Sequence, residues 1–162
     1  MRLFRIAPEK FLENYTGLGG SFEDGARWNL PQTPVMYFGL TASVAMLEMT
    51  NYTASPRKVP PSYRLGLYEL DDDAAISELI ESDLPEDWSA FPYPESTQEI
   101  GNQWLQSLEG VGLIVPSCAV SGGLEHIMVV NPRHQDIKKL RFKHSFKDIF
   151  NPRAFAGVYL EE

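Results

Sequence analysis

The chain has 162 residues, which favours a single domain over 1–162 with one hydrophobic core. Its 43% hydrophobic residues are typical of a globular protein, and no apolar run approaches the roughly 20 residues of a membrane span. The net charge of −8 argues against direct nucleic-acid binding, because phosphate contacts need clustered cations.

The N-terminus and the cysteine content indicate a compartment. The first residues soon become polar and lack the apolar segment of a signal peptide. Cys118 is the single cysteine, so no intramolecular disulfide can form and we expect a cytoplasmic protein without membrane association. We interpret Cys118 itself as a small buried residue in preference to a nucleophile.

The first half of the chain predicts two short strands, a helix and a third strand. The strands are expected at 3–6 and 35–38, and a weaker alternating pattern covers 63–69. Thr41 is a suitable N-cap for a helix over about 42–52, which reads as fully buried apart from Glu48.

Acidic residues crowd the middle of the chain. No Lys or Arg occurs between Arg64 and Arg133, whereas eight acidic residues lie between Asp71 and Asp87. This pattern favours a solvated acidic surface, and the docking of a basic protein partner is the alternative.

The second half predicts a loop, a helix and two strands. Prolines at 85, 92 and 94 indicate an extended loop over 83–94. Thr97 is expected to cap a helix over about 98–108 that ends before Gly110, with an apolar stripe formed by Ile100, Trp104 and Leu108. Buried strands are expected at 111–115 and 127–130.

Three residues stand in local sequences that indicate a binding site. Arg27 lies in Gly-Ala-Arg-Trp-Asn, Glu48 is the only charged residue between Thr41 and Ser55, and Ser117 ends an apolar strand. A cation, a carboxylate and a hydroxyl in such settings suggest a site for an anionic small molecule. The alternative is structural, with Arg27 and Glu48 as a buried ion pair and Ser117 as a strand-end cap.

Other motifs that could indicate a phosphate-binding or metal site are weak. The glycine-rich segment at 17–20 lacks a following Lys-Ser/Thr, so we do not expect it to bind phosphate directly. His126, His134 and His144 are too dispersed for a zinc site, and we predict no metal.

Several ordered motifs resemble a known family. G-A-R-W-N-x-x-x-T-P-V-x-Y is followed by S-x-A-x-L-E, then T-Q-x-I-G-x-x-W-L, then V-P-S and N-P-x-H. Together they resemble the RES-domain toxins of bacterial toxin–antitoxin modules, over about 4–155. The chain departs from that pattern at Ala26, where a second glycine is common, at Ile127 and its two preceding residues, and at Asn151.

The resemblance implies a fold, a site and partners. It implies a compact α+β domain similar to ADP-ribosyltransferase toxins, with Arg27, Tyr37, Glu48 and Ser117 in the active site and Trp28 beside them. NAD+ would be the substrate and no cofactor would be needed. A cognate Xre-like helix-turn-helix antitoxin would plug the site, and the toxin would meet nucleic acid only through that antitoxin.

Chemistry assigns a role to each residue of this set. Glu48 would stabilise the oxocarbenium-like state formed when the nicotinamide–ribose bond breaks, and Arg27 would bind the pyrophosphate bidentately. Tyr37, or alternatively Trp28, would stack on a ring, and Ser117 would orient the ribose or nicotinamide. The acceptor stays open between water, phosphate and a protein, and a non-catalytic binding module is a further alternative.

Overall fold

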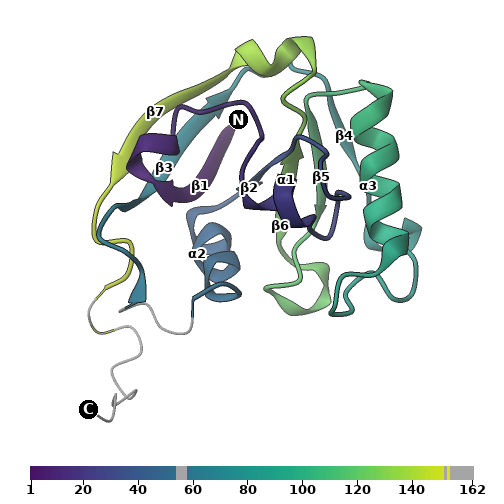
Figure 1. Ribbon diagram of the computed structural model, residues 1–162, viewed down its shortest axis with the longest axis horizontal. Helices are drawn as coiled ribbons and strands as arrows, with labels where there is room; N and C mark the ends of the chain where they lie inside the picture. The colour runs from purple at the N-terminus through teal and green to yellow at the C-terminus, as the bar shows by residue number, and fades with distance from the viewer. Residues whose placement is uncertain (54–57, 152, 154–162) are drawn as a thin grey trace.

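The computed structural model describes residues 1–53, 58–151 and 153, which form a mixed sheet with helices (Figure 1). The strand order is β4-β5-β6-β2-β1-β3-β7, antiparallel except for β4 with β5. The strands are β1 (Arg2–Pro8), β2 (Met36–Gly39), β3 (Tyr63–Leu70), β4 (Ile76–Glu78), β5 (Gly112–Pro116), β6 (His126–Val130) and β7 (Leu140–Phe146). The α-helices are α1 (Gly20–Asp24), α2 (Ala42–Thr50) and α3 (Glu95–Ser107). Short 3-10 turns occur at Glu9–Phe11, Glu81–Asp83, Ser121–Gly123 and Gln135–Lys139. The predicted α+β class is confirmed.

The hydrophobic core has two parts because side chains alternate across each strand. On β2, Met36 and Phe38 pack with Tyr68 in one cluster. Val35, immediately before β2, packs in the other cluster with residues of α2 and α3, including Val44 and Leu105. The two longer helices therefore cover one face of the sheet, and Figure 1 shows α3 alongside the β4–β5 end.

Helix α2 begins where its sequence predicts. The Thr41 hydroxyl accepts a 3.1 Å hydrogen bond from the backbone N–H of Val44, which is an N-cap. The expectation of full burial is wrong, since Val44 and Ala45 are buried but Leu47 is 41% exposed. The helix packs through one side on β1 and β2 and leaves the other side in solvent.

Helix α3 starts earlier than its sequence suggests. Pro94, and not Thr97, precedes its first turn, and the Thr97 hydroxyl donates to the Pro94 carbonyl from inside the helix. The predicted stripe is also displaced, since Leu108 is half exposed whereas Leu105 is fully buried. The buried face of α3 carries mainly small and polar residues. At Gly101 an added side chain would collide with the Trp28 backbone.

Strands β1 and β2 diverge after one pair. Phe4 pairs with Gly39, and no further pair joins these strands in the described residues. In contrast, β1 stays paired with β3 along its whole length, from Arg2 to Pro8. The sheet therefore forks between β1 and β2, which leaves room for a cavity within it.

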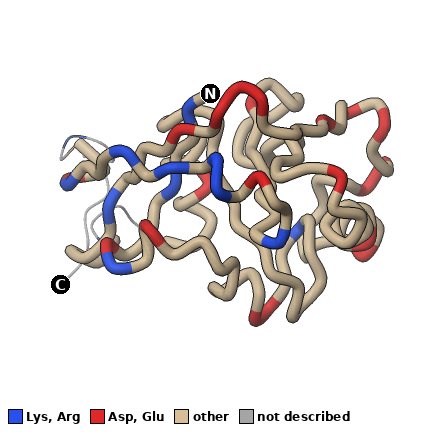
Figure 2. The backbone as a smooth tube through the Cα atoms, turned by 90° about the horizontal axis from the view of Figure 1, so that it is seen from above, with Lys and Arg blue, Asp and Glu red and all other residues tan. Residues whose placement is uncertain are grey.

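Charges are unevenly distributed over the molecule. Figure 2 shows Lys and Arg gathered mainly in the half of the molecule that holds the C-terminus, whereas acidic segments occur along the molecule and predominate at the opposite end. Side chains of Asp72, Asp73, Glu78, Glu86 and Asp87 in the acidic segment are exposed, as expected for a solvated surface. No helix in the described part of the chain is both long and apolar enough to span a membrane.

Candidate active site

A cavity of about 510 Å³ occupies the fork in the sheet. Its walls come from β1, β2 and α2, from the segment around 16–21, and from Tyr93 in the loop before α3. In the part of the chain that the structure describes, its charged lining residues are Arg5, Arg27 and Glu48. Small-molecule sites commonly have volumes of roughly 300–1,000 Å³. The cavity is therefore the candidate site for the anionic ligand expected from the sequence.

A hydrogen bond joins Glu48, on the wall of this cavity, to Ser117. The Ser117 Oγ donates a 2.6 Å hydrogen bond to Oε1 of Glu48, and the Asn51 amide donates to Oε2 at 3.2 Å. Ser117 itself accepts from the backbone N–H of Ala119 and has no exposed surface. The serine therefore orients the Glu48 carboxylate and also caps the end of β5. Direct contact between Ser117 and a ligand, as expected from the sequence, would require this buried hydroxyl to become accessible.

Arg27 lines the cavity and anchors a neighbouring loop. Its Nη1 donates to the backbone carbonyls of Trp88 at 2.5 Å and Ala90 at 2.9 Å, and its guanidinium lies 5.2 Å from the centre of the Tyr93 ring. No ion pair within 4.0 Å joins Arg27 to Glu48 or to any other described carboxylate. The structural alternative of a buried Arg27–Glu48 pair is therefore wrong.

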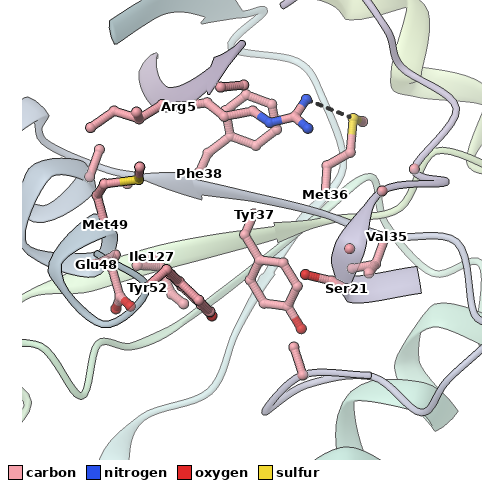
Figure 3. Close-up of a pocket in the computed structure, with 18 of the residues that line it drawn as sticks. Arg5, Ser21, Val35, Met36, Tyr37, Phe38, Glu48, Met49, Tyr52 and Ile127 are labelled. Atoms are coloured by element: carbon pink, nitrogen blue, oxygen red, sulfur yellow. Dashed lines mark hydrogen bonds between the residues drawn. The ribbon is translucent and has the colours of Figure 1, made fainter. Parts of the chain in front are cut away.

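Tyr37 extends from β2 into the same cavity (Figure 3). Its hydroxyl donates to Asn29 Oδ1 at 2.7 Å and accepts from the Trp28 backbone N–H at 3.2 Å. Burial raises the pKa of Tyr37 far above its usual value, so the phenol stays neutral. Its ring is half-buried and its position is fixed at the hydroxyl end, which suits a stacking surface.

Trp28 belongs to the core. Its side chain has no exposed surface and packs with Val44, Leu105 and Val115. The residue nevertheless lies at the border of the cavity. The indole is therefore not available as a stacking face in this structure, and stacking on a ligand stays a prediction for Tyr37.

Cys118 is exposed, so the expectation of a buried cysteine is wrong. It follows Ser117 directly and lines the cavity. Burial of part of the thiol raises the pKa of Cys118, while the charge and hydrogen bond of Arg27 act in the opposite direction. The Cys118 and Arg27 side chains therefore lie close enough to interact.

Sequence reasoning missed several residues at this site. Fully buried Asn29 positions Tyr37 and also donates to the carbonyls of Ser21 and Leu30. Tyr52 and Tyr93 line the cavity and approach each other through their hydroxyls at 3.3 Å. Asn29 stands two residues from Arg27 in the same motif, a signal that was available, whereas the Tyr52–Tyr93 contact joins segments 41 residues apart.

The glycine-rich segment and two of the residues that depart from the family pattern lie at the cavity. Gly17, Gly19 and Gly20 line the cavity, and a Cβ added to Gly19 or Gly20 would meet no atom within 4 Å. The described residues contain no group of His, Cys, Asp and Glu side chains that suits a metal ion. Ala26 and Ile127 are among the residues that line the cavity, and Asn151 and His126 are not.

Comparison with known proteins identifies the family. The family model described as "RES domain" matches residues 2–148. A protein named Toxin Res from Yersinia enterocolitica is 32% identical over 85% of this chain and 88% of its own length. A Prs ADP-ribosylating toxin from Sphingobium sp. is 28% identical over 87% of this chain and 86% of its own length.

A solved structure supports the fold. A chain from the M. tuberculosis MbcT–MbcA toxin–antitoxin complex matches with a TM-score of 0.70 and 20% identity, covering 90% of this chain and 82% of that one. At this identity the likeness concerns the fold alone. The chain belongs to the RES domain family, and it is a homologue of proteins named as toxins. The family resemblance drawn from the sequence motifs is thereby confirmed.

Proposed function

We propose that this chain is the toxin of a toxin–antitoxin module and that it consumes NAD+ by cleaving the nicotinamide–ribose bond. The toxin role is supported by the names of its relatives. The observation that carries the chemistry is the Glu48 carboxylate, held by Ser117 at 2.6 Å on the wall of a cavity that also presents Arg27.

The cavity suits the size and charge of a dinucleotide. Its volume of about 510 Å³ lies within the range of cofactor-sized sites. Among the described residues, two guanidinium groups and one carboxylate line it, so the formal charge of this lining is positive although the whole chain carries −8. A ligand with two phosphate groups would complement that charge.

Glu48 would act on the ribose. When the bond between the ribose carbon and the nicotinamide nitrogen breaks, its electron pair leaves with neutral nicotinamide and positive charge develops on the sugar. An ionised carboxylate at fixed orientation stabilises that charge without reorganising during the reaction. Because the Ser117 hydroxyl donates a hydrogen bond to Oε1 of Glu48, the orientation of the carboxylate is fixed before the substrate binds.

Arg27 and Tyr37 would hold the rest of the substrate. One nitrogen of Arg27 is engaged by two carbonyls, which fixes the plane of the guanidinium for an anion at its other donors. Tyr37 would offer its ring to nicotinamide or adenine. Together these residues would place the sugar against Glu48.

Transfer of ADP-ribose to a protein is the second candidate activity. It is favoured by the relative named a Prs ADP-ribosylating toxin. Both activities share the bond that breaks and differ only in the nucleophile that attacks the ribose, which site access selects.

Product analysis would separate these activities. The purified protein would be incubated with NAD+ alone, with phosphate, and with cell extract. ADP-ribose indicates hydrolysis, phosphorylated ADP-ribose indicates phosphorolysis, and label from NAD+ on a protein band indicates transfer. Nicotinamide release in none of the three mixtures would leave a non-catalytic binding module as the remaining role.

A cognate antitoxin would hold the enzyme inactive. We expect an Xre-like helix-turn-helix protein that occupies the cavity, with a carboxylate, such as its C-terminus, directed at Arg27. DNA would be bound through that protein and not through the acidic toxin. Expression of the chain alone should arrest bacterial growth, co-expression of a neighbouring gene should relieve the arrest, and Glu48→Gln should not arrest growth.

A further inference from the structure

One face of helix α3 lies against the segment that carries Arg27. Gln98, Gly101 and Asn102 are spaced three and four residues apart, so they share one side of the helix. All three meet the segment 26–33, which leads from α1 to β2. Gln98 and Gly101 belong to the T-Q-x-I-G-x-x-W-L motif, which has no part in the reaction as described so far. None of the three is among the described residues that line the cavity, so any effect of theirs on a ligand must be indirect.

Gln98 holds the peptide group that precedes Arg27. Its side-chain Nε2 donates a 3.1 Å hydrogen bond to the backbone carbonyl of Ala26. The same carbonyl accepts from the backbone N–H of Asn29 at 3.4 Å, and the Asn29 carbonyl accepts from the Ala26 N–H at 3.1 Å. Arg27 therefore lies in a turn closed by Ala26 and Asn29, and Gln98 fixes that turn to α3.

Gly101 and Asn102 hold the rest of the same segment. A Cβ added at Gly101 would lie 2.1 Å from the Trp28 carbonyl oxygen, so the backbone after Arg27 rests directly on the helix. Further along, the Thr33 hydroxyl donates a 2.7 Å hydrogen bond to Oδ1 of Asn102. The backbone on both sides of Arg27 is therefore fixed relative to α3.

The loop before α3 holds the side chain of the same arginine. Nη1 of Arg27 donates to the backbone carbonyls of Trp88 and Ala90. The Ser96 hydroxyl, in the first turn of α3, donates a 2.9 Å hydrogen bond to Oδ1 of Asp87 and so joins this loop to the helix. Helix α3 and the loop before it thus hold both the backbone and the guanidinium of Arg27, which fixes the direction of its remaining donors.

We propose that Gln98 is a positioning residue that directs the Arg27 guanidinium toward a phosphate group of the ligand. The inference rests on the proposed function, in which Arg27 binds the diphosphate of NAD+. A guanidinium binds phosphate through parallel donors in one plane, so its affinity depends on orientation more than that of a point charge does. Without the Gln98 bond, the turn at 26–29 keeps its internal hydrogen bonds but can tilt on α3, and the guanidinium loses its alignment.

A double-mutant cycle on ADP-ribose binding, measured by calorimetry, tests the proposal without turnover. Gln98→Met keeps the chain length and removes the donor. Gln103→Met is the matched control, since Gln103 lies on the exposed side of α3. We expect Gln98→Met to weaken ADP-ribose binding about fivefold and Gln103→Met to leave it unchanged. In an Arg27→Met background, Gln98→Met should have no further effect, because the group that it positions is absent.

The Arg27→Met background separates a positioning role from a structural one. An equal loss of affinity with and without Arg27 would mean that Gln98 acts through the general fold, and it would overturn the proposal. Wild-type affinity in Gln98→Met would overturn it as well. If Gln98→Met does not fold, Gln98→Asn takes its place, because asparagine keeps the amide but withdraws it by one methylene. We expect the same loss in that variant, and wild-type affinity there contradicts the proposal.

Nicotinamide release, measured on the same proteins, distinguishes this inference from the proposed function. Cleavage of NAD+ by the wild type, together with unchanged ADP-ribose binding in Gln98→Met, overturns the inference alone. ADP-ribose binding that depends on Gln98 through Arg27, without nicotinamide release, supports the inference and overturns only the proposed cleavage. Absence of ADP-ribose binding by the wild type overturns the inference whether or not nicotinamide is released.

Discussion

The Ser117 hydroxyl donates a 2.6 Å hydrogen bond to Oε1 of Glu48, and this bond joins the end of β5 to helix α2. The two residues are 69 positions apart in sequence, so only the folded chain brings them together. The bond fixes a carboxylate at the cavity wall while the serine remains buried. This hydrogen bond gives Ser117 a function other than that of a nucleophile, which a neighbouring base would have to activate.

Replacement of Glu48 by Gln should remove activity while preserving the fold. The amide keeps the volume and an oxygen that can accept from Ser117, but it loses the charge that would stabilise the sugar cation in the proposed reaction. We expect nicotinamide release to fall by about a hundredfold or more. Thermal melting should be close to wild type, and Glu99→Gln on the exposed side of α3 serves as the control. Normal turnover by Glu48→Gln would remove Glu48 from the mechanism.

Replacement of Ser117 by Ala should lower kcat more than it changes KM. The substitution frees the carboxylate to rotate, and a small misplacement of a catalytic group costs up to about a hundredfold in rate. KM should change little because Ser117 has no exposed surface. Ser43→Ala, at an exposed position of α2, is the matched control. A raised KM with unchanged kcat would instead indicate that Ser117 binds the substrate directly.

Arg27→Lys should weaken binding although it keeps the positive charge. Lysine cannot donate to Trp88 and Ala90 while also presenting a planar fork to an anion. Measured by calorimetry in a Glu48→Gln background, NAD+ affinity should fall by about tenfold or more, since hydrogen bonds to charged groups contribute roughly 1.5–3 kcal/mol. Wild-type affinity in this variant would restrict Arg27 to holding the loop.

Alkylation of Cys118 should depend on pH and on ligand. Burial raises the pKa of Cys118, so the reactive thiolate is scarce at neutral pH and increases as the pH rises toward that raised value. The rate of reaction with iodoacetamide should therefore still be rising above pH of about 8.5, the ordinary thiol value. ADP-ribose should slow the reaction because Cys118 lines the cavity. A rate that levels off below pH 8.5, or one indifferent to ADP-ribose, would contradict this arrangement.

The sequence predicted the elements whose signals are local. The Thr41 cap and the strands that became β1, β2, β5 and β6 follow from capping and apolar patterns that neighbouring residues decide. The start of α3 was misplaced because Thr97 resembles an N-cap but bonds back to Pro94 from inside the helix. The edge strands β4 and β7 were not predicted, since β4 has only 3 residues and the alternation of apolar and charged residues in β7 is interrupted after Lys143.

The candidate site was predicted in its parts but not in its geometry. Motif resemblance selected Arg27, Tyr37, Glu48 and Ser117, and the structure brings Glu48 and Ser117 into direct contact. That contact, like the fork between β1 and β2, depends on tertiary packing that no local pattern encodes. Arg5 was overlooked because an arginine in a short N-terminal strand gives no sign that it will line a cavity.

The most direct test of the central claim is nicotinamide release by the purified, antitoxin-free protein. NAD+ would be incubated with the wild-type chain and followed by chromatography, with and without phosphate and cell extract. We predict that nicotinamide grows in with time and in proportion to enzyme. Unchanged NAD+ at high enzyme concentration under all of these conditions would contradict the assignment of this cavity to NAD+ cleavage.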